Sequence, residues 1–155
     1  MKPKAFVFAV LLSLLLAAGC FAQNVNMGTW KLNEAKSKIA AGGAKNHTVV
    51  YEAAGDQIKV IVDGIAGDGS ATHNEWTGKF DGKYYAVTGD ATSDERSYRM
   101  IGARTLALTG RKAGKVTLTG RIIITRNGKS RTVTTNVTDA NGKRFSSTAV
   151  YDKEM

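Results

Sequence analysis

The feature that most constrains this chain is an alternation of apolar and polar residues, interrupted at short intervals by glycine-containing turns. Within residues 115–126, Leu118, Ile122 and Ile124 fall on one side of a period-two pattern and Thr119 and Arg121 on the other. Successive side chains of a strand point to opposite faces, so this pattern predicts a half-buried strand. Valine, isoleucine and threonine, which are frequent here, also suit a pleated surface.

The same pattern recurs along the chain and predicts ten strands. They are expected at residues 27–33, 47–53, 57–63, 70–80, 83–88, 95–101, 104–111, 115–126, 129–138 and 143–152. Asp81-Gly82 and Asn127-Gly128 are typical of two-residue hairpin turns in which both central residues take a positive φ.

Ten consecutive strands joined by short turns indicate an antiparallel meander. An open meander would leave two unpaired edges, whereas closure into a barrel removes both. We therefore predict an all-β fold, a ten-stranded antiparallel up-and-down β-barrel. A two-sheet sandwich is the alternative, although its crossing connections are usually longer than these.

Residues 1–22 have the pattern of a secretory signal peptide. Lys2 and Lys4 precede an apolar run, residues 5–18, that is too short to be a membrane span, and small residues follow it. Cleavage after Ala22 would leave residues 23–155, the usual size of one domain. We expect an exported, periplasmic or secreted, monomeric protein.

Cys20, the only cysteine, leaves a second cleavage site open. Residues 16–20, LAAGC, resemble a bacterial lipobox, in which the cysteine is lipidated and becomes the mature N-terminus. The protein would then be a membrane-anchored lipoprotein with no transmembrane span. In both cases the folded domain contains no thiol and no disulfide.

Trp30 is the first large aromatic residue, and it stands near the start of the first predicted strand. It shares one face of that strand with Leu32, and a small barrel needs a bulky residue to plug one end. Gly28 would let another segment approach the strand closely. We interpret Gly28 and Trp30 as structural residues that close the barrel.

Two short motifs resemble those of the calycins, which include the lipocalins and the intracellular fatty-acid-binding proteins. Residues 28–32, GTWKL, resemble the first-strand motif, and residues 149–153, AVYDK, resemble the closing strand of the fatty-acid-binding proteins. The resemblance implies a lipocalin-like barrel that binds a small apolar molecule. It also implies a ligand contact for Tyr151, which matches the tyrosine that holds the ligand carboxylate in that family.

The chain departs from the family at two places. Ala149 stands where the closing strand of the family carries an arginine, and residues 34–46 are too few for the two-helix lid. We therefore expect a barrel without a helical lid and without the family's carboxylate anchor. Neutral amphipathic molecules should then bind at least as well as fatty acids.

The alternation also predicts which residues face the interior. Tyr98, Phe145 and Tyr151 are the candidate ligand-binding residues, and the small Ser147 and Ala149 would leave room beside them. In a meander, alternate connections emerge at the same end, so the longer connections gather at one end. Ligands favour the mouth of such a barrel.

Other chemistry is scarce in this sequence. His47 and His73 are the only histidines, and His73 with Glu75 is interpreted as a surface pair, so we expect no metal site and no cofactor. No nucleophile stands in an activating motif, and we do not expect an enzyme. The excess of basic residues is interpreted as a solvated surface and not as a nucleic-acid site.

Two functions remain open at this stage. The first is an exported lipocalin-like protein that binds a small apolar or amphipathic ligand. The second is a barrel filled by its own side chains, which acts through surface contacts with a protein or the cell envelope. The volume of the inward side chains alone cannot separate them, because the shear of the barrel is unknown.

Overall fold

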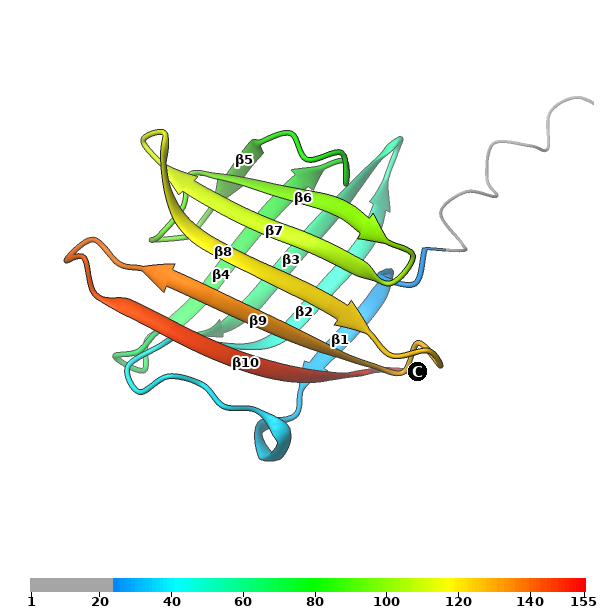
Figure 1. Cartoon of the computed structure of the whole chain (residues 1–155), viewed down its shortest axis with the longest axis horizontal. Helices are drawn as coiled ribbons and strands as arrows, with labels where there is room; N and C mark the ends of the chain where they lie inside the picture. The colour runs from blue at the N-terminus through cyan, green and yellow to red at the C-terminus, as the bar shows by residue number, and fades with distance from the viewer. Residues whose placement is uncertain (1–23) are drawn as a thin grey trace, which may run out of the picture.

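The structure is a computed structural model that describes residues 24–155. Ten strands follow one another in chain order (Figure 1). They are β1 (Gly28–Leu32), β2 (Lys45–Ala54), β3 (Gln57–Ile65), β4 (Ala71–Gly78), β5 (Tyr85–Thr88), β6 (Glu95–Gly102), β7 (Thr105–Lys112), β8 (Lys115–Ile124), β9 (Ser130–Thr138) and β10 (Arg144–Lys153). Each overlaps one of the ten predicted strands.

The strands form a closed antiparallel barrel in which each strand pairs with its sequence neighbours. Closure occurs between the first strand and the last, where Trp30 on β1 lies opposite Lys153 on β10. On its other side, Trp30 lies opposite Val49 on β2. The up-and-down barrel is thus confirmed, and the two-sheet sandwich is excluded.

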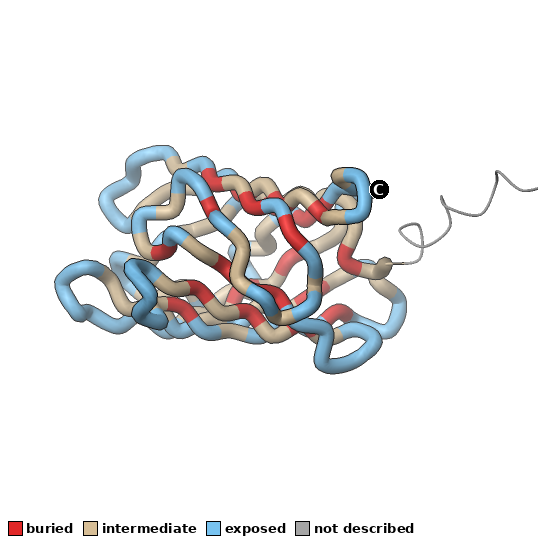
Figure 2. The backbone as a smooth tube through the Cα atoms, turned by 90° about the horizontal axis from the view of Figure 1, so that it is seen from above, coloured by how far each residue is buried: buried red, intermediate tan, exposed pale blue. Residues whose placement is uncertain are grey.

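The buried residues form one core inside this barrel, as the alternating red segments of Figure 2 show. Alternate residues of most strands point inward, so the buried positions largely follow the period of two that the sequence displays, except in β6, where residues 96–98 are all buried. The largest buried side chains include Trp30, Trp76 and, unusually for a core, Arg131.

Trp30 lies at the end of the barrel where the chain enters β1, which we call the closed end. Its side chain is fully buried, and its indole Nε1 donates a hydrogen bond of 2.8 Å to the carbonyl oxygen of Asn26. The Nζ of Lys153 lies 5.1 Å from the Trp30 ring centre and donates to the carbonyl oxygen of Val25 at 3.3 Å. These contacts tie the entering chain, the first strand and the last strand together.

Gly28 makes this closure possible. Its φ is +104°, a conformation that L-residues with side chains rarely adopt, and a Cβ on it would lie 3.1 Å from Cε of Lys153. Glycine therefore allows both the turn into β1 and the passage of the Lys153 side chain.

The turns differ from the sequence prediction. Gly82 and Gly128 have positive φ, but Asp81 and Asn127 do not, so neither dipeptide forms the predicted two-residue turn. Asp81 instead forms an isolated bridge with Arg99, and residues 79–84 make a longer connection between β4 and β5. The tight turn with two positive φ values lies at Ala113-Gly114, where Ala113 has a φ of 49°.

The connection between β1 and β2 contains a single 3₁₀ turn, η1 (Glu34–Lys36), and no helical lid. Asn33 caps this turn by accepting a hydrogen bond from the backbone N–H of Lys36 at 3.2 Å. Residues 37–40 then run along β10, where Lys38 pairs with Thr148 and the backbone N–H of Ala40 donates to the Ser147 hydroxyl, and residues 41–44 lead into β2. Within residues 24–155, no helix has the length and apolar character needed to cross a membrane.

Candidate functional site

A cavity of about 350 Å³ lies inside the barrel and reaches the end opposite Trp30. At that end it is bordered by the connections 39–44, 66–67 and 89–92, together with Asp139. These belong to the longer connections that the sequence predicts at one end, and we call this end the mouth. The volume lies within the usual range for small-molecule sites, about 300–1,000 Å³.

The three predicted ligand-binding residues all line this cavity. Tyr98 and Tyr151 are buried, Phe145 is half-buried, and the small Ser147 and Ala149 lie on the same strand as Tyr151. The other walls are mainly aliphatic. They include Val49, Val62, Leu108, Leu118, Ile122, Val133 and Val137. Trp30 is absent from the lining, and Cys20 lies outside the described residues.

Arg131, on β9, is the unexpected member of the cavity lining. It lies directly opposite Tyr151 in the β9–β10 ladder, near the closed end, and only 2% of its surface is exposed. Its guanidinium carbon lies 4.6 Å from the ring centre of Trp30, 4.9 Å from that of Tyr51 and 5.1 Å from that of Tyr151. Three aromatic rings thus surround one buried cation.

No acidic side chain of the described residues pairs with Arg131. Its Nε and Nη1 atoms are buried and have no hydrogen-bond partner within residues 24–155. Buried guanidinium groups are normally paired with carboxylates, because an uncompensated buried charge is strongly unfavourable. Cation–π contacts offset part of that cost, but they leave the N–H donors unsatisfied.

The ionisation of the neighbouring groups reflects this environment. Burial raises the pKa of Tyr151 to about 12, although the nearby charge of Arg131 acts in the opposite direction. Burial also lowers the pKa of Lys153, and the positive charge of Arg131 lowers it further. The Tyr151 hydroxyl therefore stays protonated at neutral pH and can donate a hydrogen bond beside the guanidinium.

Arg131 corrects one expectation from the sequence. The absence of an arginine at Ala149 suggested an interior without a carboxylate anchor, but the structure places a guanidinium beside Tyr151 from the neighbouring strand. A signal for it was present in residues 131–137, where Arg131 shares the inward face with Val133 and Val137. A basic residue at the first position of such a face is easily read as the polar end of a strand.

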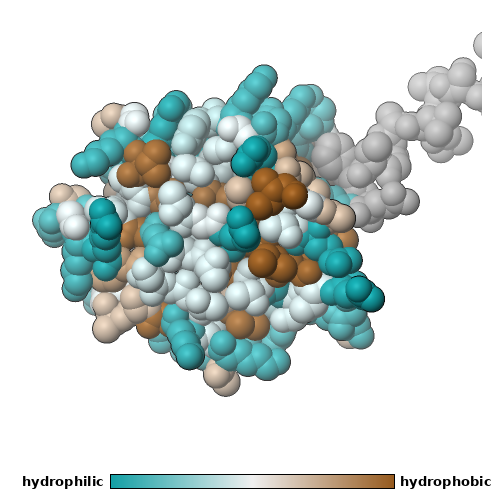
Figure 3. Space-filling view, viewed as in Figure 1, coloured by the Kyte–Doolittle hydropathy of each residue, from teal (hydrophilic) through white to brown (hydrophobic). Residues whose placement is uncertain are grey.

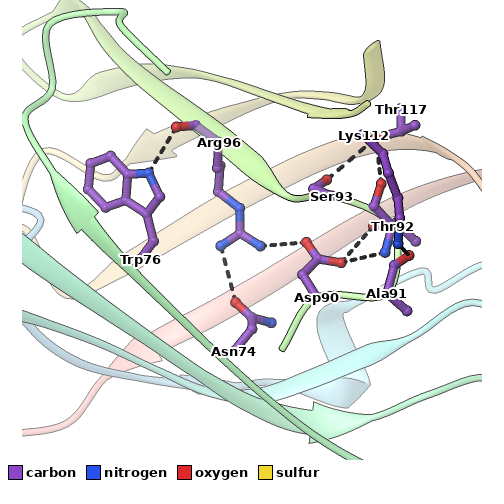
Figure 4. A network of polar contacts seen from close by, with 9 residues as sticks. All are labelled: Asn74, Trp76, Asp90, Ala91, Thr92, Ser93, Arg96, Lys112 and Thr117. Atoms are coloured by element: carbon purple, nitrogen blue, oxygen red, sulfur yellow. Dashed lines mark hydrogen bonds and ion pairs between the residues drawn. The ribbon is translucent and has the colours of Figure 1, made fainter. Parts of the chain in front are cut away.

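A second arginine, Arg96 on β6, lies in the wall nearer the mouth, where both of its Nη atoms are paired while its buried Nε has no partner within residues 24–155 (Figure 4). Its Nη2 donates to Oδ2 of Asp90 at 2.8 Å, and its Nη1 donates to Oδ1 of Asn74 at 3.2 Å. Its carbonyl oxygen accepts a hydrogen bond from the indole of Trp76 at 2.9 Å. This arginine therefore has a structural partner that Arg131 lacks.

The Arg96–Asp90 pair fixes the 89–94 connection over the mouth. The other carboxylate oxygen of Asp90 accepts 2.8 Å hydrogen bonds from the backbone N–H and the hydroxyl of Thr92. Lys112 reaches the carbonyl oxygen of Ala91 at 2.6 Å, and Thr117 donates to that of Thr92 at 2.7 Å (Figure 4). This part of the mouth is thus held from β6, β7 and β8.

Tyr98 lies between the surroundings of Arg96 and those of Arg131, because it packs against Trp76 on one side and Tyr51 on the other. Its ring centre lies 4.8 Å from that of Trp76 and 6.4 Å from that of Tyr51, in edge-to-face arrangements. Burial raises the pKa of the Tyr98 hydroxyl well above its ordinary value, and the proximity of Tyr51 raises it further. The cavity wall therefore contributes neutral tyrosines and cationic arginines at physiological pH.

The histidines lie away from this cavity, on the surface. Nδ1 of His73 lies 2.6 Å from Oδ1 of Asp63, and its Nε2 lies 3.2 Å from Oε1 of Glu75. The side chain of His47 is 45% exposed, so it does not point inward. Within the described part of the chain, no group of three or more His, Cys, Asp or Glu residues could hold a metal ion.

We expect His73 to titrate above its ordinary pKa of about 6.5, because its hydrogen bond to Asp63 favours the charged form. The resulting stabilisation should be fully present below the unfolded-state pKa and should be lost as the pH rises through the folded-state pKa. Proton NMR titration of the His73 ring checks the pKa. The Asp63→Asn variant should move it down toward the ordinary value, and an unchanged pKa would contradict this assignment.

Comparison with known proteins leaves the family open. No protein-family model matches the chain, and no curated protein matches it significantly. The closed ten-stranded barrel is consistent with a calycin-like fold. The cavity and the residues that line it are therefore the basis for assigning a function.

Proposed function

We propose that this barrel binds a small amphipathic anion, with the anionic group of the ligand placed against Arg131. The observation that carries the proposal is a buried guanidinium with two unpartnered donor atoms inside a cavity of about 350 Å³. A carboxylate or a similar oxyanion would accept hydrogen bonds from those donors and neutralise the charge. It would supply the partner that the described chain does not provide.

The distribution of polarity in the cavity supports one orientation of the ligand. Arg131 and the Tyr151 hydroxyl lie toward the closed end, whereas Leu108, Leu118 and Ile122 line the space between them and the mouth. An apolar tail would bury its surface against these aliphatic side chains, at about 25 cal/mol per Å². The ligand therefore enters with its anionic group first.

The same cavity favours ligand binding over the alternative of a filled barrel. The inward side chains of Trp30 and Tyr51 fill the closed end. Nearer the mouth, the small side chains of Ser147 and Ala149 leave space in the interior. We propose a binding protein and not an enzyme, because the Arg131 guanidinium and the Tyr151 hydroxyl in the cavity are suited to binding the negative charge of a ligand.

A displacement titration tests the proposed function. An environment-sensitive apolar dye is bound to the protein and displaced by decanoate or by decanol, which share a chain length and differ in charge. We expect decanoate to displace the dye at a concentration at least about tenfold lower, because a hydrogen bond to a charged group contributes about 1.5–3 kcal/mol. Equal potency of acid and alcohol would contradict the anionic site, and failure of both to bind would contradict ligand binding altogether.

We further propose that the protein is exported. When the full chain is expressed in a bacterium, we expect it outside the cytoplasm with a mature N-terminus at Gln23, or at a diacylated Cys20 if the lipobox is used. Intact-mass analysis of the purified protein distinguishes the two. A cytosolic protein that retains Met1 would contradict export.

A further inference from the structure

The charge of this protein is concentrated in one part of the chain. Residues 96–138 contain ten Lys and Arg residues and no Asp or Glu, whereas the rest of residues 24–155 contains ten basic and thirteen acidic residues. Strands β6 to β9 account for nearly all of that stretch, and they form one continuous wall of the barrel (Figure 1). The excess of positive charge therefore belongs to that wall.

Half of these ten basic side chains face solvent and lie toward the closed end of the barrel. Arg96 and Arg131 point inward, and Arg111 is paired with Glu95. Seven others are exposed and form no ion pair with any described residue. Two of them, Lys112 and Lys115, flank the β7–β8 turn at the mouth, and the remaining five lie nearer the closed end: Arg99, Arg104, Arg121, Arg126 and Lys129. We call these five residues, with the apolar side chains between them, the basic wall.

Exposed apolar side chains are part of the same surface. Met100 is 43% exposed and Ile101 is 40% exposed, both beside the β6–β7 turn, and Ile123 on β8 is 49% exposed. Figure 3, which views the barrel from the side of these strands, shows hydrophobic residues set among hydrophilic ones. Such a mixture of cationic and apolar side chains suits the interface of a bilayer, where the charges meet head groups and the apolar groups enter the acyl boundary.

The chain enters the barrel at the same end. The backbone N–H of Lys153 donates to the carbonyl oxygen of Lys129 at 2.8 Å, and its Nζ reaches the carbonyl oxygen of Val25. Cys20 stands four residues before Asn24, a distance that an extended chain spans in at most about 14 Å. An acyl chain on Cys20 would hold the closed end against a membrane.

We propose that the basic wall docks on an anionic phospholipid bilayer. Five unpaired cations provide the charge complementarity, and Met100, Ile101 and Ile123 provide apolar groups that a purely electrostatic partner would not require. None of these residues lines the cavity. The inference therefore does not depend on the proposed ligand, and docking leaves the mouth of the barrel accessible.

Sedimentation with vesicles tests this inference, using the full chain with Cys20→Ser so that lipidation does not contribute. Vesicles contain phosphatidylcholine alone or a mixture with phosphatidylglycerol. We expect binding only to the anionic vesicles and loss of binding at about 0.5 M salt, where exposed charges are screened. The triple variant Arg99→Gln, Arg104→Gln, Arg126→Gln should bind about a hundredfold more weakly, at about fivefold for each charge removed.

A matched control removes the same charge elsewhere. The variant Lys36→Gln, Lys38→Gln, Arg144→Gln should bind like the parent, because these exposed residues lie on or beside β10, outside the basic wall. Equal weakening in both triple variants, or equal binding to neutral vesicles, would overturn the inference. The unfolding midpoint of each variant shows that the fold is retained.

A second variant distinguishes a membrane from a nucleic acid. Met100→Ser with Ile101→Ser should weaken binding to anionic vesicles about tenfold, because apolar area no longer enters the interface. Binding tighter to a single-stranded DNA oligonucleotide than to the vesicles, or vesicle binding unchanged in this variant, would overturn the membrane inference.

Discussion

Replacing Arg131 with methionine should stabilise the ligand-free protein and abolish its preference for an anionic ligand. The guanidinium is buried with two unsatisfied donors, and methionine would keep most of the packing against Trp30 and Tyr51 while it removes the charge. We expect the free energy of unfolding to rise by about 1–4 kcal/mol, as is common when buried charges are replaced by packed apolar groups. Urea unfolding and the displacement titration measure the two effects.

The control for this experiment is Arg121→Met, which removes the same charge from the outer surface of β8. Its stability should change by less than about 0.5 kcal/mol, and its preference for decanoate should be unaltered. If Arg131→Met instead loses stability and still prefers the acid, then Arg131 contributes to folding and does not bind the ligand. A variant that gains stability but loses its preference for the acid would show that Arg131 serves ligand binding at a cost in stability.

Truncating Trp30 to alanine should have the largest effect on stability, a loss of about 3–5 kcal/mol. The fully buried indole fills the closed end, donates a hydrogen bond to Asn26 and packs against the cations of Arg131 and Lys153. Such a loss is a large share of the stability of a typical domain, about 5–15 kcal/mol. The urea midpoint of the variant measures it.

Lys31→Ala serves as the comparison, because Lys31 is exposed on the opposite face of the same strand. The one side-chain hydrogen bond that Lys31 makes within residues 24–155, to Thr48, is exposed, so the urea midpoint should change little. An unchanged midpoint for Trp30→Ala would contradict its role in closing the barrel.

The fold was largely predictable from the sequence because one signal repeats along it. The alternation in Leu118, Ile122 and Ile124 is set by the pleat of a strand, a local property. Closure follows from the number of strands and the short connections, since an open sheet of this size would leave exposed edges. The inward positions of Tyr98 and Tyr151 follow from the same alternation of inward and outward side chains along each strand.

The candidate site was only partly predictable, for physical reasons. Arg131 and Tyr151 meet across a ladder whose register depends on the turn between their strands, and no local pattern fixes that register. The Asp90–Arg96 pair depends on how the 89–94 connection folds back over the mouth. Similarly, Ala113 takes a positive φ that its residue type alone does not favour.

Native mass spectrometry of the protein purified from its own host shows whether a ligand occupies the cavity at Arg131. We expect the protein to carry a small molecule that is released as an anion, and Arg131→Met purified in the same way to carry none. A wild-type protein found only at its polypeptide mass, or a ligand retained equally by Arg131→Met, would contradict an anion site at Arg131.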